Sequence, residues 1–260
     1  MDLPFAKKSL GQHWLTDSAS LEAMCQAAGV EARDTVLEIG PGLGTLTDLL
    51  VKRAGQVVAV EFDAKLADEL PGRVPADNLQ VLQQDILGLD FTQLPPGYKV
   101  VANIPYYLTS NLIRVLSETN NPPAVAVLLV QKEVAERVAA KPGAMSILGV
   151  TAQYYWDVRT GSEVPAELFT PPPKVDSQIL ILHRRPEPLF PDVDEKVFFR
   201  LVKAGFSQKR KTLQNSLSGG LHSSREQATS LLTAAGIEPT VRAQTLSLEQ
   251  WYALYRAYNA

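Results

Sequence analysis

The fold of this 260-residue chain is decided by the stretch Thr35-Val36-Leu37-Glu38-Ile39-Gly40-Pro41-Gly42-Leu43-Gly44-Thr45. Its first half is a short apolar run typical of a buried strand, and a helical pattern of leucines follows its second half. The three glycines between them allow a tight turn and a close approach of the backbone to a ligand. The stretch therefore predicts one strand–turn–helix unit of an α/β fold.

Similar units repeat along the chain on the C-terminal side of this stretch. Apolar runs at 57–60, 79–82, 100–102 and 124–130 alternate with helical patterns. Near-continuous apolar strands separated by helices indicate a mainly parallel sheet with helices on both faces. Two late strands, expected at about 149–156 and 177–183, would form an antiparallel hairpin at the edge and bring the sheet to seven strands.

The last part of the chain has a different pattern. A proline-rich linker begins at Arg184, and only helical patterns follow it. We expect a first domain at 1–185, with an N-terminal arm at 1–17, and a small all-α domain at 186–260. An apolar stripe near the C-terminus is interpreted as packing between helices; it consists of Leu248, Trp251, Tyr252, Tyr255 and Tyr258.

Composition excludes several classes of protein. The single cysteine, Cys25, allows no intrachain disulfide and no zinc–thiolate site, which favours an intracellular protein. The first residues lack the apolar core of a signal peptide, and the longest apolar run, 124–130, is too short to cross a bilayer. The three histidines have no spacing typical of metal ligands, so we expect no metal.

Charge is unevenly distributed along the chain, although the net charge is only −3. Residues 31–95 contain eleven acidic and five basic residues, a net of −6, whereas residues 199–225 contain six basic residues and no acid, a net of +6. A basic segment of this kind is a candidate polyanion-binding surface, although a solvated helix face is the ordinary explanation.

Polar groups stand where four strands end. The glycine loop follows the first strand, Glu61 the second, Asp85 the third and Asn103 the fourth. In an open parallel sheet, ligands bind at the carboxyl ends of the strands. Glu61 could accept hydrogen bonds from both hydroxyls of a ribose, and Asp85 could accept one from the amino group of an adenine.

The glycine loop separates two kinds of adenosine-containing ligand. A dinucleotide-binding loop should have glycine or alanine at position 45, where this chain has Thr45. The pattern Glu38-x-Gly40-x-Gly42-x-Gly44 is instead typical of the S-adenosylmethionine loop of class I methyltransferases, so we expect S-adenosylmethionine as the cofactor.

The tetrapeptide Asn103-Ile104-Pro105-Tyr106 suits the task of holding a flat, weakly nucleophilic amino nitrogen. The Asn103 side-chain oxygen and the Ile104 carbonyl could each accept one N–H bond. Pro105 stiffens the turn, and Tyr106 offers a face for stacking. Such a tetrapeptide also serves methyltransferases that act on DNA adenine or on the side-chain amide of glutamine, so it does not select the substrate by itself.

Taken together, these motifs resemble the ribosomal RNA adenine dimethylases over nearly the whole chain, and within them most closely the bacterial small-subunit enzymes of the kasugamycin-resistance type. The matching segments are Gly11 to Leu15, Glu38 to Thr45, Glu61, Gln84-Asp85, Asn103 to Tyr106, Val130 to Arg137, Phe169 to Ser177 and Phe206 to Leu213. Two departures are Trp14, where Phe is usual, and the short apolar segment 142–149.

The resemblance implies a class I methyltransferase (Rossmann-like) fold with a helical C-terminal RNA-binding domain. It implies that His13, Leu15, Gly40, Gly42, Gly44, Glu61, Asp85 and Asn103 bind the cofactor, and that Asn103, Ile104, Pro105, Tyr106 and Phe169 act on the adenine, with Phe169 stacking opposite Tyr106. Lys209, Arg210 and Lys211 are expected to bind RNA phosphates.

The implied activity is double methylation of N6 on two adjacent adenines in the 3′-terminal hairpin of small-subunit (16S) rRNA. The expected partner is an immature small ribosomal subunit, and the expected protein is a cytoplasmic monomer. Two alternatives remain open: a large-subunit rRNA adenine methyltransferase, and a non-catalytic RNA-binding assembly factor on the same scaffold.

Overall fold

The computed structural model describes residues 11–260. The chain divides into two compact units, one with the residues up to Ala135 and Asp157–Arg184, the other with Glu136–Trp156 and Arg185–Ala260. The domain boundary expected at 185/186 lies next to one junction between these units, while 136–156 groups with the C-terminal helices. Residues 1–10 of the expected arm lie outside the described part.

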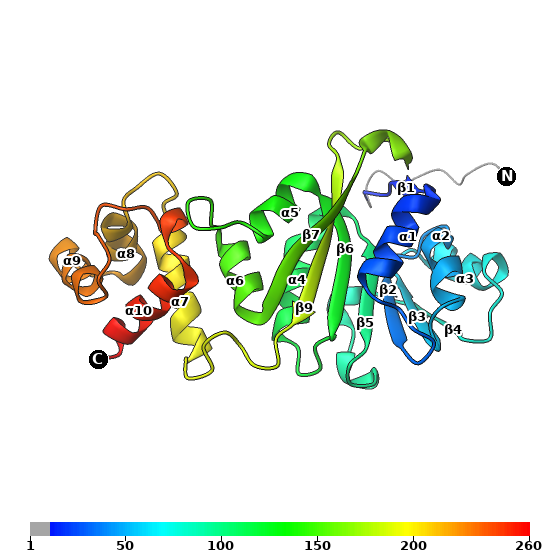
Figure 1. Cartoon of the computed structure of the whole chain (residues 1–260), viewed down its shortest axis with the longest axis horizontal. Coiled ribbons are helices and arrows are strands. Elements are labelled where there is room, and N and C mark those ends of the chain that lie inside the picture. Colours follow the sequence, from blue (N-terminus) through cyan, green and yellow to red (C-terminus); the bar gives the residue numbers. More distant parts are fainter. Residues whose placement is uncertain (1–10) are drawn as a thin grey trace. The chain divides into compact units, whose positions relative to one another are not determined.

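A seven-stranded sheet organises the first unit (Figure 1). Its strands are β2 (Thr35–Ile39), β3 (Gln56–Glu61), β4 (Leu79–Gln83), β5 (Lys99–Asn103), β6 (Val125–Gln131), β7 (Trp156–Val164) and β9 (Ser177–Arg184). They lie in the order β4-β3-β2-β5-β6-β9-β7. The β4–β3, β3–β2, β2–β5 and β5–β6 pairs are parallel, and β6–β9 is antiparallel. The predicted α/β class and mainly parallel seven-stranded sheet are confirmed.

Ten α-helices are present among the described residues. They are α1 (Ser18–Ala27), α2 (Thr45–Val51), α3 (Ala64–Arg73), α4 (Thr109–Glu118), α5 (Lys132–Val138), α6 (Ile147–Tyr155), α7 (Glu195–Phe206), α8 (Leu213–Leu221), α9 (Arg225–Ala234) and α10 (Leu248–Tyr258). A separate two-stranded ladder pairs β1 (Trp14–Leu15) with β8 (Phe169–Thr170). None of the helices in 11–260 is long and apolar enough to span a membrane.

Apolar packing covers the face of the sheet on which α1 and α2 lie. On this face α1 and α2 bury Met24 and Leu50 against strand residues such as Val36 and Val101, and Figure 1 shows these two helices lying over the strands. The single cysteine belongs to this core, and its burial raises the pKa of the Cys25 thiol to about 11. Cys25 is therefore a packing residue with little thiolate at neutral pH.

One predicted strand is wrong. We expected a strand at about 149–156, but residues 147–155 form helix α6 and the strand β7 begins only at Trp156. The side chain of Ser146 caps α6 by accepting a hydrogen bond from Gly149 N at 3.0 Å. The helix then places Tyr154 and Tyr155 in an aromatic cluster of the second unit, where the Tyr154 and Phe198 ring centroids are 5.3 Å apart.

That aromatic cluster forms the core of the second unit around α7 and α10. Its rings are those of Tyr154, Tyr155, Phe190, Phe198, Phe199, Tyr252 and Tyr255. The interpretation of the C-terminal apolar stripe as packing is confirmed for three of its residues: Trp251 is fully buried, Tyr252 stacks on Phe190 at 4.4 Å and Tyr255 contacts Phe198. Tyr258, by contrast, is exposed.

Candidate functional site

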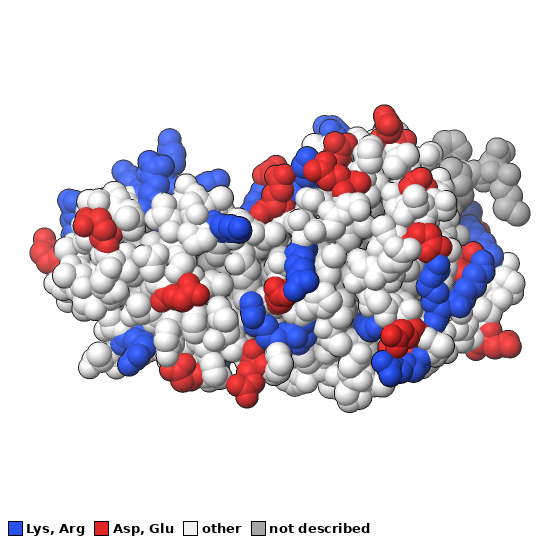
Figure 2. Space-filling view, in the orientation of Figure 1, with Lys and Arg blue, Asp and Glu red and all other residues white. Residues whose placement is uncertain are grey.

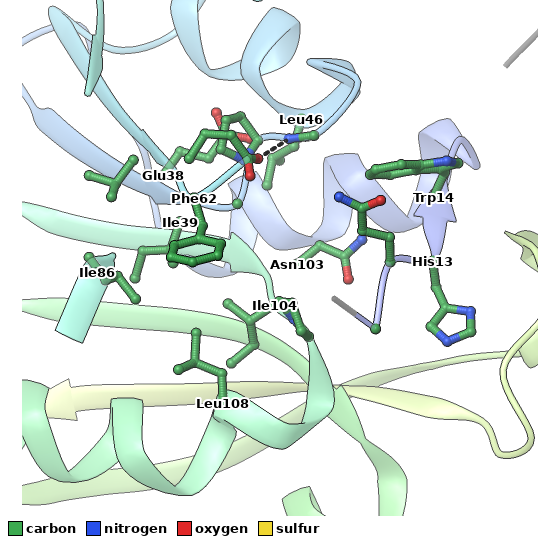
Figure 3. Close-up of a pocket in the computed structure, with 18 of the residues that line it drawn as sticks. His13, Trp14, Glu38, Ile39, Leu46, Phe62, Ile86, Asn103, Ile104 and Leu108 are labelled. Carbon is green, nitrogen blue, oxygen red and sulfur yellow. Dashed lines mark hydrogen bonds between the residues drawn. The ribbon is translucent and has the colours of Figure 1, made fainter. Parts of the chain in front are cut away.

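A pocket lies at the carboxyl ends of β2, β3 and β5 in the first unit (Figure 3). It is lined by residues from the arm, the glycine loop, three strand ends and the β8 segment. The predicted site residues among them are His13, Leu15, Gly40, Gly42, Glu61, Asp85, Asn103, Ile104, Pro105, Tyr106 and Phe169. Residues separated by more than 150 positions in the chain thus meet where the parallel strands end, as expected for this topology.

The glycine loop takes a backbone conformation that side chains rarely adopt. Gly40 has a φ of +67° and Gly42 a φ of +56°. A Cβ on Gly42 would lie 2.6 Å from Cζ3 of Trp14, so this glycine also makes room for the indole. The loop can therefore present its backbone to a ligand on one side while Trp14 packs against it on the other.

Glu61 is fixed by backbone donors on both of its oxygens. Gly42 N donates to Oε2 at 3.1 Å and Asp63 N donates to Oε1 at 2.9 Å. Burial raises the pKa of this carboxyl, while the two N–H donors oppose the shift. Each oxygen retains a lone pair, so Glu61 can still accept hydrogen bonds from two hydroxyls of a ligand.

Glu38, the first residue of the loop motif, is fully enclosed at 1% exposure. Its Oε2 and the Thr47 hydroxyl both lack a hydrogen-bond partner among the described residues. Burial raises the pKa of Glu38 to about 8; the neighbouring Thr47 opposes this shift and the carboxylate of Glu61 adds to it. The enclosed position of Glu38 beside the pocket therefore favours the protonated, uncharged form of its carboxyl.

An apolar wall, which the sequence motifs did not identify, forms one side of the pocket. Phe62, Ile39 and Ile86 line it, and Figure 3 shows them grouped on one side of the site with His13 and Trp14 on the other. Phe62 is 58% exposed, which is unusual for so large an apolar side chain. An aromatic residue directly after Glu61 was the signal in the sequence that could have found it.

Asp85 lies beside this wall and begins a short 3-10 helix. Its Oδ1 accepts from Leu87 N at 3.0 Å, which fixes the direction of the carboxylate. The loop, Glu61, Asp85 and the apolar wall together fit an adenosine: the backbone and the carboxylates would bind its polar groups, and the apolar side chains would pack against its ring.

The tetrapeptide Asn103 to Tyr106 forms the other side of the pocket. Asn103 is the last residue of β5, and a Cβ on Gly40 would come within 3.9 Å of its carbonyl oxygen. The Tyr106 hydroxyl is 2.7 Å from the hydroxyl of the fully buried Ser177 on β9. This hydrogen bond holds the ring of Tyr106 in place and was not predicted, because it joins residues 71 positions apart.

Phe169 lies on β8 and is only 2% exposed. It pairs with Leu15 across the β1–β8 ladder and packs in the same core cluster. The ring of Tyr106 instead stacks with that of His13, at a centroid distance of 6.0 Å and an interplanar angle of 19°. Phe169 lines the pocket, and its stacking on an adenine stays a prediction.

Four predicted residues do not line this pocket. Gly44 caps α2 with a φ of +85°, and a Cβ there would lie 2.8 Å from Val74 and 2.9 Å from Leu70, so it serves packing against α3. Lys209, Arg210 and Lys211 lie in the second unit, exposed in the loop between α7 and α8 rather than on a helix. Figure 2 shows Lys and Arg side chains gathered over that loop.

No group of three or more His, Cys, Asp or Glu side chains within residues 11–260 is arranged to hold a metal ion.

Comparison with known proteins gives a consistent result over the full length. The family model for ribosomal RNA adenine dimethylase matches residues 5–260. A ribosomal RNA small subunit methyltransferase A from Dehalococcoides mccartyi is 42% identical over 258 residues, covering 98% of this chain and 89% of that protein. The protein of the same name from Streptococcus pneumoniae is 40% identical, covering 95% of this chain and 90% of that protein.

Two solved structures also resemble the chain. A dimethyladenosine transferase from Plasmodium falciparum superposes with a TM-score of 0.81 at 26% identity, covering 95% of this chain and 98% of that one. The 23S rRNA methyltransferase ErmE superposes with a TM-score of 0.75 at 28% identity, covering 95% of this chain and 100% of that one.

Proposed function

Because the chain belongs to the ribosomal RNA adenine dimethylase family, we propose that it methylates N6 of two adjacent adenines in the 3′-terminal hairpin of small-subunit (16S) rRNA, giving N6,N6-dimethyladenosine. The chain is an S-adenosylmethionine-dependent rRNA adenine methyltransferase. The choice of the small subunit is supported by the names of the relatives that are 40–42% identical to it, and the choice of this hairpin follows from the family resemblance.

The observation that carries the proposal is the meeting of Asn103 and the glycine loop at one sheet edge. When bound there, S-adenosylmethionine supplies an electrophilic methyl group on a sulfonium. Gly40, Gly42, Glu61 and Asp85 would hold its adenosine, with Phe62 and Ile86 against the ring. The target adenine would enter from the side of Tyr106.

The residues of the tetrapeptide would act by positioning. The Asn103 side-chain oxygen and the Ile104 carbonyl accept the two N6 hydrogens, so that the nitrogen lone pair points at the methyl group. Tyr106 stacks on the ring, an interaction worth on the order of 1–3 kcal/mol per base. A strong general base is unnecessary because the proton leaves once the nitrogen is cationic, so orientation and electrostatics dominate.

The further parts of the proposal follow from the family. The substrate is an rRNA whose adenine leaves its stack, which costs least in a loop. Lys209, Arg210 and Lys211 bind phosphates, and the helical domain expected at 186–260 presents them. The protein works as a cytoplasmic monomer on an immature small subunit.

A labelling experiment tests the activity. Tritiated S-adenosylmethionine is incubated with the enzyme and small subunits that lack the modification, and the nucleosides are then separated. We expect label in N6,N6-dimethyladenosine from small-subunit rRNA. Label confined to large-subunit rRNA would support an enzyme with the activity named for ErmE, and binding without any transfer would support a non-catalytic assembly factor.

The Asn103→Ala variant tests the mechanism. Transfer should fall at least 100-fold, because both orientation and charge stabilisation of N6 are lost, while cofactor affinity stays within about tenfold by calorimetry. Asn111→Ala is the matched control, since Asn111 is exposed on α4. Near-normal turnover of Asn103→Ala would remove this residue from the reaction.

A further inference from the structure

We propose that Tyr107 is a second stacking residue for the RNA, and that it binds the nucleobase next to the adenine in the pocket. The inference rests on the proposed function, in which Tyr106 stacks on the target adenine and a second adenine is its direct neighbour. It adds a substrate-binding residue outside the Asn103 to Tyr106 motif and gives that residue a ligand of defined chemistry, the flat face of a purine.

Tyr107 is a highly exposed aromatic residue. It lines the pocket and is 67% exposed, so it lies at the mouth of the pocket rather than at its floor. Within residues 11–260, large apolar side chains are exposed at six positions, and three of these, Phe62, Leu87 and Tyr107, line this one pocket. Exposed apolar side chains gathered at one site indicate a surface that a ligand covers.

The cofactor accounts for two of these three side chains. Phe62 directly follows Glu61, and its neighbour in the pocket lining, Leu87, stands two positions after Asp85. Both therefore belong to the part of the pocket assigned to the adenosine. Tyr107 instead directly follows the tetrapeptide at the end of β5. It thus lies on the side from which the proposed function brings the target adenine.

The local backbone directs Tyr106 and Tyr107 differently. Residues Tyr106–Leu108 form a 3-10 turn, in which Leu108 N donates a hydrogen bond to the carbonyl of Pro105 at 3.0 Å. Neighbouring side chains on such a turn are about 120° apart. Because the Tyr106 ring is held by its hydrogen bond with Ser177, the ring of Tyr107 is the one that the turn presents at the mouth.

The ring of Tyr107 is supported along one edge by the backbone of the arm. A Cβ on Gly11 would lie 3.6 Å from both Cδ1 and Cε1 of this ring, so the ring packs beside that glycine. The high exposure of Tyr107 shows that most of its surface is still open to a ligand. Tyrosine provides such a surface at low conformational-entropy cost, because only two side-chain torsions are fixed on binding.

A nucleobase next to the target adenine is the ligand that fits these features. A nucleotide that leaves its stack to enter a pocket stays linked to its neighbour, whose base has then lost a stacking partner. Tyr107 directly follows Tyr106, so the two rings are placed to meet adjacent nucleotides. An aromatic side chain can replace the lost stacking partner of any base. A purine gains most, because its two fused rings offer the larger face.

The first experiment measures the methylation kinetics of Tyr107 variants on small subunits that lack the modification. Tyr107→Ala should lower kcat/KM for the subunits by about 5- to 150-fold, the factor that one base–aromatic stack supplies. Tyr107→Phe keeps the aromatic face and should restore most of this loss, whereas Tyr107→Leu keeps only apolar bulk and should not. Affinity for S-adenosylhomocysteine, measured by calorimetry, should be unchanged in all three variants.

A second experiment identifies the ligand of Tyr107. Subunits are prepared whose rRNA carries uracil in place of one or the other of the two adenines, so that the remaining adenine has a neighbour with a smaller stacking face. The loss caused by Tyr107→Ala should be several-fold smaller on at least one of these subunits, because less stacking is there to be lost. Asn111→Ala is the control, since Asn111 is exposed on α4 and does not line the pocket.

Four outcomes would overturn the inference. Normal kcat/KM of Tyr107→Ala would remove this residue from the RNA site, and an equal loss on all three kinds of subunit would show that it contacts no neighbouring base. A matching loss of S-adenosylhomocysteine affinity would make it a cofactor contact. A urea midpoint of unfolding well below that of Asn111→Ala would make it a structural residue.

The same measurements separate this inference from the proposed function. Absence of N6,N6-dimethyladenosine with the unsubstituted enzyme and unsubstituted subunits would refute the proposed function. Equal rates of dimethyladenosine formation by the unsubstituted enzyme and Tyr107→Ala would refute the inference alone.

Discussion

At the scale of single residues, Tyr106 is positioned by a hydrogen bond that lies outside its own motif. Its hydroxyl is 2.7 Å from that of Ser177, which is fully buried at the start of β9. Ser177→Ala leaves the tyrosine hydroxyl unpaired, at a cost of about 1–3 kcal/mol. We expect adenine methylation to fall about 5- to 150-fold with cofactor affinity retained, measured by labelled methyl transfer and calorimetry.

Ser162→Ala is the control for this prediction, because Ser162 is exposed on β7 in the same unit. Combining Ser177→Ala with Tyr106→Phe should lower activity little more than either change alone, since both remove one bond. Additive losses in the double variant would show that Ser177 acts on activity by a route other than Tyr106.

Glu38 gives the site a predictable pH dependence. Burial raises the pKa of its carboxyl from an ordinary value of 4.5 to about 8. Between these two values the folded state keeps a proton that the unfolded state releases, so stability is highest at low pH and falls as the pH rises towards 8. Above about pH 8 the Glu38 carboxyl is ionised in both states. The folded state then carries the full free-energy cost of burying that charge, on the order of 1.4 kcal/mol for each unit by which the pKa is raised.

Glu38→Gln should remove this dependence. Urea unfolding between pH 5 and pH 9 should show a steep loss of stability for the unsubstituted protein and a flatter profile for the variant. Glu167→Gln makes the same chemical change at an exposed position and should leave the profile unchanged. A Glu38→Gln profile as steep as that of the unsubstituted protein would mean that another group holds the proton.

The residues of the site divide into those that the sequence could predict and those that it could not. Glu61, Asp85 and Asn103 were predictable because each marks a strand end, and parallel strands bring their ends together. Ser177 on Tyr106 and Trp14 on Gly42 were not, because these contacts depend on side chains far apart in the chain. The near-complete burial of Phe169 could not be predicted either, because it depends on the pairing of β1 with β8.

At the scale of elements, Gly44 determines how α2 packs against α3. Its φ of +85° is unfavourable for alanine, and a Cβ would lie 2.8 Å from Val74 and 2.9 Å from Leu70. Gly44→Ala therefore combines backbone strain with overpacking, which typically costs about 1–3 kcal/mol. We expect the free energy of unfolding, measured with urea, to fall by the sum of both effects.

Gly97 separates these two effects. It has a similar φ of +80°, but nothing lies within 4 Å of an added Cβ. Gly97→Ala thus measures the backbone strain alone, and its difference from Gly44→Ala isolates the packing of α2 on α3. Equal losses in the two variants would contradict a packing role for Gly44.

Helices and strands could be predicted where their sequence pattern is long. The prediction was wrong where tertiary contacts determine the secondary structure. The strands from β2 to β6 follow from apolar runs. The run at 149–156 suits either a strand or a helix, and the aromatic cluster around Tyr154 and Phe198 accompanies the helical choice. The exact start of α9 was not predictable either, because it depends on the two hydrogen bonds of the capping box formed by Ser224 and Gln227.

At the scale of the whole molecule, the basic segment found in the sequence contains an exposed loop. Lys209, Arg210 and Lys211 are all exposed between α7 and α8, with no acidic residue in the surrounding segment 199–225. Each cation that binds a phosphate releases counterions, so the logarithm of affinity falls with the logarithm of salt concentration. Replacing all three with alanine should weaken binding to small subunits and reduce that slope by about 0.7–0.9 per lost contact.

A control variant removes three positive charges from the first unit instead. Arg33, Lys52 and Arg114 are exposed cations of the first unit, and each pairs with an acid on a nearby residue, at 3.0, 2.6 and 3.0 Å. Their replacement by alanine should leave the salt slope nearly unchanged, because paired cations displace few counterions from RNA. Equal losses from the two triple variants would assign the effect to net charge. An unchanged slope in the Lys209, Arg210 and Lys211 variant would show that this loop does not contact the RNA.

In the Lys209, Arg210 and Lys211 variant, kcat at saturating RNA should be retained, because these residues do not line the pocket that contains Asn103.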